Sequence, residues 1–137
     1  MGSERYEQLI AFLSTHLPPP IEQEQLADGI LVFRGGSPGE VIATLTRSSV
    51  IIEEFRMEWP TPSMPVVRPR RVGAVKWRRL PETAAMNAIE QLIKGAREVR
   101  RGRYRTCQMC GTNTPPEWLT DEDTCQTCAP PEREVVH

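Results

Sequence analysis

The chain has 137 residues, of which 39% are hydrophobic and 26% charged, as in a soluble globular protein. This length suits one domain with a modest core and a small appendage, and it is too short for two full domains. The sequence has no apolar run of about 18 residues, and its N-terminus carries early acidic residues instead of a cationic and then apolar segment. We therefore expect a cytoplasmic protein with reduced thiols and no transmembrane helix.

The net charge of −1 conceals an uneven distribution. Residues 1–65 carry four arginines against nine acidic side chains, and their net charge is −5. Residues 66–106 carry twelve basic side chains against three glutamates, a net charge of +9, and residues 107–137 carry one arginine against six acids, a net charge of −5. This acidic, basic, acidic order predicts that the middle segment meets phosphate or an acidic partner, or neutralises its own acidic flanks.

The first predicted element is an amphipathic helix over residues 4–17. Its apolar side chains recur at spacings of three and four, as on one face of an α-helix, at Tyr6, Leu9, Ile10, Leu13 and Leu17. Ser3 is a candidate N-cap, and the prolines at 18–20 end the helix. Residues 21–29 are predicted to form a loop with at most a short helical turn.

Residues 30–59 have the pattern of three consecutive strands. The segments ILVFR, EVIATLT and VIIEEFRMEW are rich in β-branched and aromatic residues and are separated by short turn-forming links. Such links imply an antiparallel meander with one face under the helices and one face in water. In the third strand one face is predicted to carry Ile51, Phe55, Met57 and Trp59, and the other Glu54, Arg56 and Glu58.

A proline-rich run, PTPSMPVVRPRR, follows at residues 60–71 and is predicted to be an extended connection, because proline cannot donate to a sheet interior. The next segment, RVGAVKWRRL, predicts a fourth strand with Val75 and Trp77 on one face and Lys76 and Arg78 on the other. Its charge suits an edge strand.

Pro81 and Glu82 predict the start of a second long helix. Its apolar stripe comprises Ala85, Ile89, Leu92, Ile93 and Ala96. We therefore predict an α+β fold with an N-terminal helix, an antiparallel sheet of about four strands and a second helix. Residues 1–100 form the α+β domain, and residues 101–137 form a zinc-binding module with an acidic tail.

All four cysteines lie in this C-terminal module, as two Cys-x-x-Cys pairs fourteen residues apart: Cys107, Cys110, Cys125 and Cys128. One such pair lets a tight turn bring two sulfurs to one ion, and two pairs supply the four ligands of a closed structural zinc site. Gly111 suits the positive φ that such a turn needs. The alternatives are a dithiol redox pair and an iron–sulfur cluster, but the parallel βαβ pattern and the ferredoxin spacing that they require are not found in the sequence.

The pattern CxxCG, a loop and CxxCA resembles the four-cysteine zinc-ribbon and treble-clef modules of bacterial proteins. It is also similar to the four-cysteine finger of the stringent-response transcription factors, although the loop here is shorter and the long N-terminal coiled coil of that family is missing. The resemblance covers about residues 107–129 and implies the four ligands alone. A treble clef would continue into a helix, for which residues 130–134 are suitable, and a ribbon would end in a strand. Both remain open.

The basic segment contains the candidate residues for binding nucleic acid or an acidic partner. They are Trp77, Arg78, Arg79, Arg97, Arg100, Arg101, Arg103, Tyr104 and Arg105. The two aromatic residues are interleaved with cations, as base-stacking sites require. The alternative is a solvated face that neutralises the acidic flanks. The zinc module itself is acidic, and its Trp118 either packs against the protein or serves as an anchor for a partner.

The sequence contains no nucleophile beside a base, and the RGGSPG loop lacks the Lys-Ser/Thr of a phosphate-binding loop. We therefore predict a non-enzymatic zinc-binding adaptor or regulatory protein that acts through a protein partner, with one structural Zn²⁺ and no small-molecule substrate or membrane. A nucleic-acid-binding, transcription-related protein that uses residues 68–105 is the alternative. An enzyme is a third, because catalytic groups assemble in space.

Overall fold

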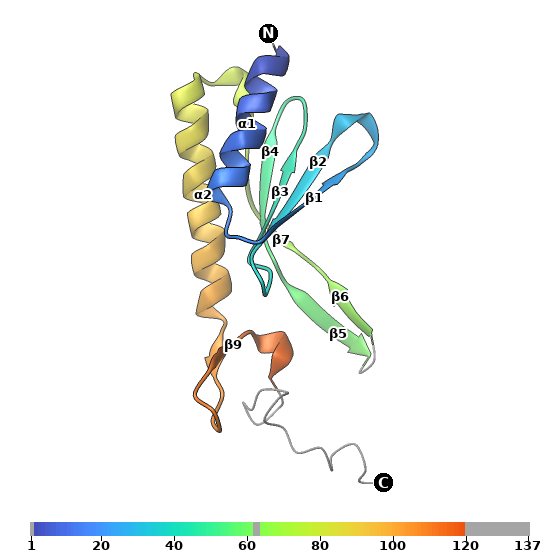
Figure 1. Cartoon of the computed structure of the whole chain (residues 1–137), viewed down its shortest axis with the longest axis vertical. Helices are drawn as coiled ribbons and strands as arrows, with labels where there is room; N and C mark the ends of the chain where they lie inside the picture. Colours follow the sequence, from blue (N-terminus) through green and yellow to red (C-terminus); the bar gives the residue numbers. More distant parts are fainter. Residues whose placement is uncertain (1, 62–63, 120–137) are drawn as a thin grey trace. The chain divides into compact units, whose positions relative to one another are not determined.

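The computed structural model describes residues 2–61 and 64–119 (Figure 1). The chain forms two compact units, Met1–Arg100 and Arg101–His137. The first unit contains α1 (Gly2–His16), β1 (Ile21–Gln25), η1 (Ala27–Gly29), β2 (Leu31–Gly35), β3 (Val41–Leu45), β4 (Val50–Glu54), β5 (Met57–Thr61), β6 (Met64–Val67), β7 (Arg70–Val75), η2 (Trp77–Arg79) and most of α2 (Glu82–Gly102). The second contains β8 (Arg105–Thr106), β9 (Asn113–Thr114) and η3 (Pro116–Trp118).

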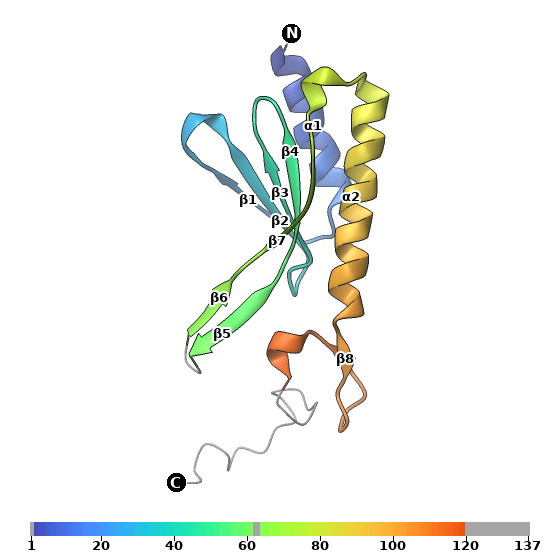
Figure 2. The same cartoon turned by 180° about the vertical axis from the view of Figure 1, so that it is seen from behind.

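The first unit is an α+β sandwich of two layers. Its five-stranded sheet has the order β1-β2-β3-β4-β7, and every neighbouring pair is antiparallel. Both helices lie on the same side of this sheet in opposite views (Figures 1 and 2). The predicted α+β class, the two helices and the antiparallel sheet are confirmed, and the sheet has one strand more than predicted.

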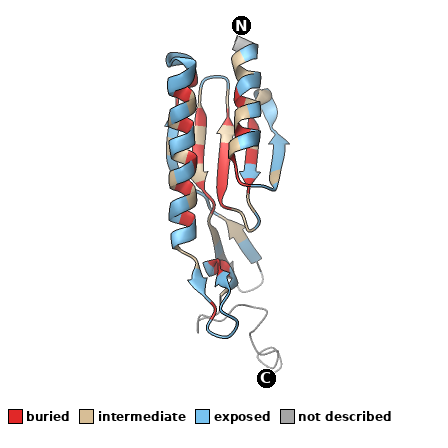
Figure 3. Ribbon diagram, turned by 60° about the vertical axis from the view of Figure 1, so that its left-hand side comes forward, coloured by how far each residue is buried: buried red, intermediate tan, exposed pale blue. Residues whose placement is uncertain are grey.

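The core lies between the helices and the facing side of the sheet (Figure 3). Alternate residues of the inner strands point into it, including Phe33, Val41, Leu45, Val50 and Ile52. The predicted helix stripes are buried there, through Leu9 and Leu13 of α1, Leu17 just after it, and Ala85, Ile89, Ile93 and Ala96 of α2. Burial of each large apolar side chain contributes about 1.5–3 kcal/mol, so this layer is the main source of stability.

The loop predicted at residues 21–29 is wrong for residues 21–25, which form β1, whereas the short helical turn allowed in that segment is found as η1. Strand β1 pairs with β2 along its whole length, from Ile21 opposite Gly35 to Gln25 opposite Leu31. Four of its five residues are exposed, because β1 is the outer strand of the sheet. Its sequence, IEQEQ, therefore lacks the apolar alternation by which a half-buried strand is recognised.

The predicted third strand is also wrong in its length and its faces. It ends at Glu54, and β5 begins separately at Met57. Alternation in β4 places Val50, Ile52 and Glu54 toward the core, and Glu54 is only 1% exposed. The predicted face, beginning with Ile51, therefore does not form as one surface.

The proline-rich run is not a simple connection, because β5 and β6 pair as a two-stranded hairpin. Met57 lies opposite Val67 and Glu58 opposite Val66, and the register shifts before Thr61. In a ribbon of two strands each strand has an outer edge, where a proline that lacks an N–H group is tolerated. The hairpin continues beyond the five-stranded sheet (Figure 2).

The predicted fourth strand is β7, and it lies at the edge of the sheet as expected. It ends at Val75, and the chain turns into η2 at Trp77. Val75 and Trp77 are both buried, whereas Lys76 and Arg78 are exposed. The second helix begins at Glu82, one residue after Pro81, whose carbonyl oxygen accepts a 2.9 Å bond from the Ala85 N–H.

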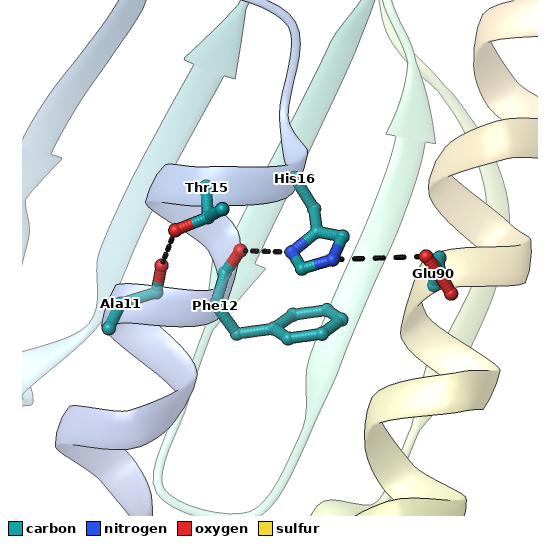
Figure 4. Close-up of polar contacts among 5 residues, drawn as sticks. All are labelled: Ala11, Phe12, Thr15, His16 and Glu90. Carbon is teal, nitrogen blue, oxygen red and sulfur yellow. Dashed lines mark hydrogen bonds and ion pairs between the residues drawn. The ribbon is translucent and has the colours of Figure 1, made fainter.

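The two helices of the first unit also contact each other through His16 (Figure 4). Its Nδ1 donates to the Phe12 carbonyl oxygen at 3.0 Å, and its ring stacks on that of Phe12 with the centroids 3.9 Å apart. Nε2 lies 3.8 Å from Glu90 Oε1 of α2, a contact that becomes an ion pair when the imidazole is protonated. The end of α1 is thereby held beside the middle of α2. No helix in the described part of the chain is long and apolar enough to cross a membrane.

Candidate metal centre and basic residues

Cys107 and Cys110 lie in a tight turn between two short paired strands. Strands β8 and β9 pair with Arg105 opposite Thr114 and Thr106 opposite Asn113. Within the turn, the Cys107 N–H donates to the Thr112 carbonyl oxygen at 2.9 Å, and the Gly111 N–H donates to the Cys107 carbonyl oxygen at 3.0 Å. The backbone therefore curls around the two cysteines as a closed loop.

Both sulfurs already have polar contacts inside this turn. The Met109 N–H donates to Cys107 Sγ at 3.4 Å, and Cys110 Sγ lies within hydrogen-bond distance, 3.1 Å, of Thr112 Oγ1. An amide that donates to a sulfur stabilises the thiolate form, which is the form that binds a metal, and the Met109 N–H does so for Cys107, whereas the Cys110 thiol donates to Thr112 Oγ1. Gly111 has φ +75°, so the expected left-handed residue after the second cysteine is found.

Two of the four predicted ligands can be placed. Cys107 is buried and Cys110 is exposed, whereas Cys125 and Cys128 lie outside the described residues. Within residues 2–61 and 64–119, no group of three or more histidine, cysteine, aspartate or glutamate side chains gathers as a metal site. The described turn places two of the four predicted ligands, and the metal centre itself stays a prediction.

Trp118 ends η3, next to this turn in the chain. Its side chain is 44% exposed, and that of Met109, between the two cysteines, is 69% exposed. The second unit therefore presents two large apolar side chains to solvent. The role of Trp118 as a partner anchor stays a prediction.

Two of the predicted phosphate-binding arginines contact the link between β2 and β3: Arg100 is buried, and Arg97 is half-buried. Arg97 Nε lies 3.0 Å from Glu40 Oε1, and Arg100 Nε donates to the Gly39 carbonyl oxygen at 2.9 Å. Arg100 is 1% exposed, and its guanidinium carbon lies 5.2 Å from the centre of the Phe55 ring. These arginines tie α2 to the link between β2 and β3, and Arg100 is too deeply buried to offer its side chain to an external phosphate.

Trp77 is likewise a core residue and not a base-stacking platform. It is 1% exposed, and its Nε1–H donates to the Thr46 carbonyl oxygen at 3.1 Å. The guanidinium groups of Arg5 and Arg78 lie over its ring, at 5.5 Å and 5.3 Å from the centroid. Arg78 and its neighbour Arg79 are exposed, as predicted.

The remaining predicted basic residues belong to the second unit. Arg101 and Arg105 are exposed, and Arg103 and Tyr104 are half-buried. The Tyr104 N–H donates to the Arg101 carbonyl oxygen at 3.0 Å, just after the end of α2. The nine candidates thus divide into a core tryptophan, two arginines that contact the β2–β3 link, two exposed arginines of the first unit and four residues of the second.

Two basic residues near Trp77 escaped the sequence analysis. Arg5 lies on α1, and Arg47 follows Thr46 in the turn between β3 and β4. Each stands outside the basic segment in the sequence, so no local pattern connects either with Trp77. Their proximity to Trp77 could be predicted only by knowing that α1 and the β3–β4 turn pack beside the end of β7.

Comparisons with protein-family models, with curated proteins and with solved structures find no significant match to this chain. Its function has to be inferred from its own residues.

Proposed function

We propose that this protein is a small non-enzymatic zinc-binding adaptor or regulatory protein. One structural Zn²⁺ is held by the four thiolates of Cys107, Cys110, Cys125 and Cys128. The observation that supports this most directly is the closed turn around Cys107, in which one backbone amide and one hydroxyl oxygen lie against the two sulfurs. The resemblance of the cysteine pattern to zinc-ribbon and treble-clef modules supports the same four ligands.

A structural role for the ion follows from its proposed ligands. Four thiolates fill a tetrahedral zinc site and leave no position for water or substrate, which a catalytic zinc requires. In the described part of the second unit, the secondary structure after the end of α2 consists of two strands of two residues each and one short 3₁₀ turn. Metal binding would provide free energy of folding for such a unit.

The adaptor role is supported by the exposed apolar side chains of the same unit. Interface anchors are enriched in tryptophan, and methionine is common on surfaces that bind other proteins. Trp118 and Met109 are exposed side chains of these two types. Zinc, by ordering the turn between β8 and β9, would give them a rigid support. A protein partner is therefore favoured for this unit, whose acidic charge would repel phosphate.

The test begins with the metal content of the purified full-length protein. We expect one zinc per chain by elemental analysis, and a loss of zinc in Cys107→Ser and in Cys125→Ser. Met109→Ser is the matched control, because it changes an exposed side chain in the same turn and leaves all four cysteines in place. A wild-type protein with well under one zinc per chain would contradict the metal site.

The partner is tested by co-purification from the native host followed by mass spectrometry. We expect a specific protein whose recovery falls when Trp118 is changed to alanine and persists in Arg71→Ala, a surface variant of the other unit. Equal recovery with both variants would contradict Trp118 as the anchor and leave the zinc result unaffected.

A further inference from the structure

Five cationic residues of the first unit belong to the segments that meet at Trp77, and we call them the Trp77 cluster: Arg5, Arg47, Lys76, Arg78 and Arg79. Lys76, Arg78 and Arg79 flank the tryptophan in the chain. Arg5 joins them from α1, because its guanidinium lies over the Trp77 ring and its Nη2 donates to the Leu80 carbonyl oxygen at 3.1 Å. Arg47 joins them from the β3–β4 turn, because the indole N–H of Trp77 binds the carbonyl oxygen of the preceding residue, Thr46.

The buried ring orients part of this cluster. The guanidinium groups of Arg5 and Arg78 both lie over it, at 5.5 Å and 5.3 Å. A guanidinium that stacks on an aromatic ring keeps the N–H groups at its edge for other partners, and these form a planar fork that matches the oxygens of a phosphate. Arg5 uses one nitrogen to donate to the Leu80 carbonyl oxygen. Arg78 is exposed to solvent.

The cluster also has an excess of positive charge that the protein itself does not pair. In the part of the chain that the structure describes, none of the five cations lies within 4.0 Å of a carboxylate. Arg71, which is not part of the cluster, lies on β7 opposite Glu53 of β4 in the strand register. Glu4, Glu7 and Glu82 are the acidic residues nearest to the cluster in the flanking sequence, against five cations in the cluster itself.

We propose that the Trp77 cluster binds the phosphate backbone of a double-stranded nucleic acid. Four of its five members are arginines, whose forks suit phosphate. Its aromatic residue is buried beneath the cations, so the surface has no platform on which an unpaired base could stack. A duplex offers phosphates of both strands at high density and needs no base stacking. Binding is therefore independent of sequence, and it does not depend on the proposed zinc site.

The experiment measures the fluorescence anisotropy of a short labelled DNA duplex titrated with the full-length protein. For three to four phosphate contacts, the affinity should fall roughly 50- to 150-fold between about 50 mM and about 200 mM salt. The double variant Arg47→Ala/Arg79→Ala should reduce the slope of log affinity against log salt by about two. Both side chains are exposed, so near-ultraviolet circular dichroism should show an unchanged fold.

Arg71→Ala is the matched control, because it removes an exposed arginine of the first unit that lies on β7, outside the cluster and opposite Glu53 in the strand register. It should bind as the wild type does. No binding at low salt, or equal binding by the wild type and the double variant, would overturn the proposal. Equal competition by polyglutamate and by unlabelled duplex would overturn it in favour of an acidic protein partner, and tighter binding of single strands would overturn the duplex as ligand.

Discussion

Phe55 contacts two arginines, Arg34 of β2 and Arg100 of α2. Their guanidinium carbons lie 5.4 Å and 5.2 Å from the centre of its ring. Gly39 lies against the same ring, and a Cβ at that position would be 2.8 Å from Phe55 Cδ2. Glycine is therefore required at position 39 by close packing.

We expect Gly39→Ala to lower the free energy of unfolding by about 1–3 kcal/mol, because the added methyl group overpacks a ring that its neighbours hold in place. Urea denaturation of the wild type and the variant measures the difference.

Gly95→Ala is the matched control for this substitution. Gly95 lies within α2, and a Cβ there meets nothing within 4 Å. Because alanine favours the helix over glycine, this variant should be about 0.5–1 kcal/mol more stable than the wild type. If Gly39→Ala were as stable as Gly95→Ala, the contact with Phe55 would not constrain position 39.

At the scale of elements, α2 is attached to the sheet in two ways. Its apolar stripe packs on the buried face of the sheet, as its helical spacing predicted. Its C-terminal part is attached by polar contacts instead, through Arg97 with Glu40 and Arg100 with the Gly39 carbonyl. The sequence offered no sign of this second attachment, because inward and outward arginines look alike in a basic run.

Arg100→Ala should therefore destabilise the protein by about 3 kcal/mol, since it empties a buried site and leaves the Gly39 carbonyl without this donor. Thermal or urea unfolding provides the measurement. Lys94→Ala, an exposed cation of the same helix, should change the stability by no more than about 0.5 kcal/mol. Equal effects of the two substitutions would show that Arg100 behaves as a surface residue.

At the scale of the whole molecule, the chain combines two units with different sources of stability. The first has an apolar core between two helices and a five-stranded sheet. The second has short strands, and in our proposal it depends on a metal. The two units should then respond differently when the metal is removed.

We expect a strong chelator to collapse the amide chemical-shift dispersion of residues 103–119 and to leave that of residues 5–96 unchanged. The indole N–H signal of Trp77 reports on the first unit, because this group is buried and bonded to Thr46. Two-dimensional NMR before and after chelation, and again after zinc is restored, provides the measurement. A second unit that keeps its dispersion without metal would contradict a structural zinc.

The sequence by itself determined those features that depend on local periodicity or spacing. The helices follow from apolar residues three and four positions apart, the inner strands from β-branched runs, and the edge position of β7 from its charge. The turn after Cys110 follows from the requirement of a glycine at positive φ, which Gly111 meets.

Only the tertiary structure decided which polar residues are inside. β1 is polar and became a strand by pairing with β2, Glu54 and Arg100 are buried in spite of their charge, and Trp77 lies beneath two cations that come from separate segments, Arg5 and Arg78. The physical reason is that burial of a charge or pairing of an edge strand depends on partners distant in the sequence. Arg5 and Arg47 approach Trp77 only after α1 and the β3–β4 turn have packed against the end of β7.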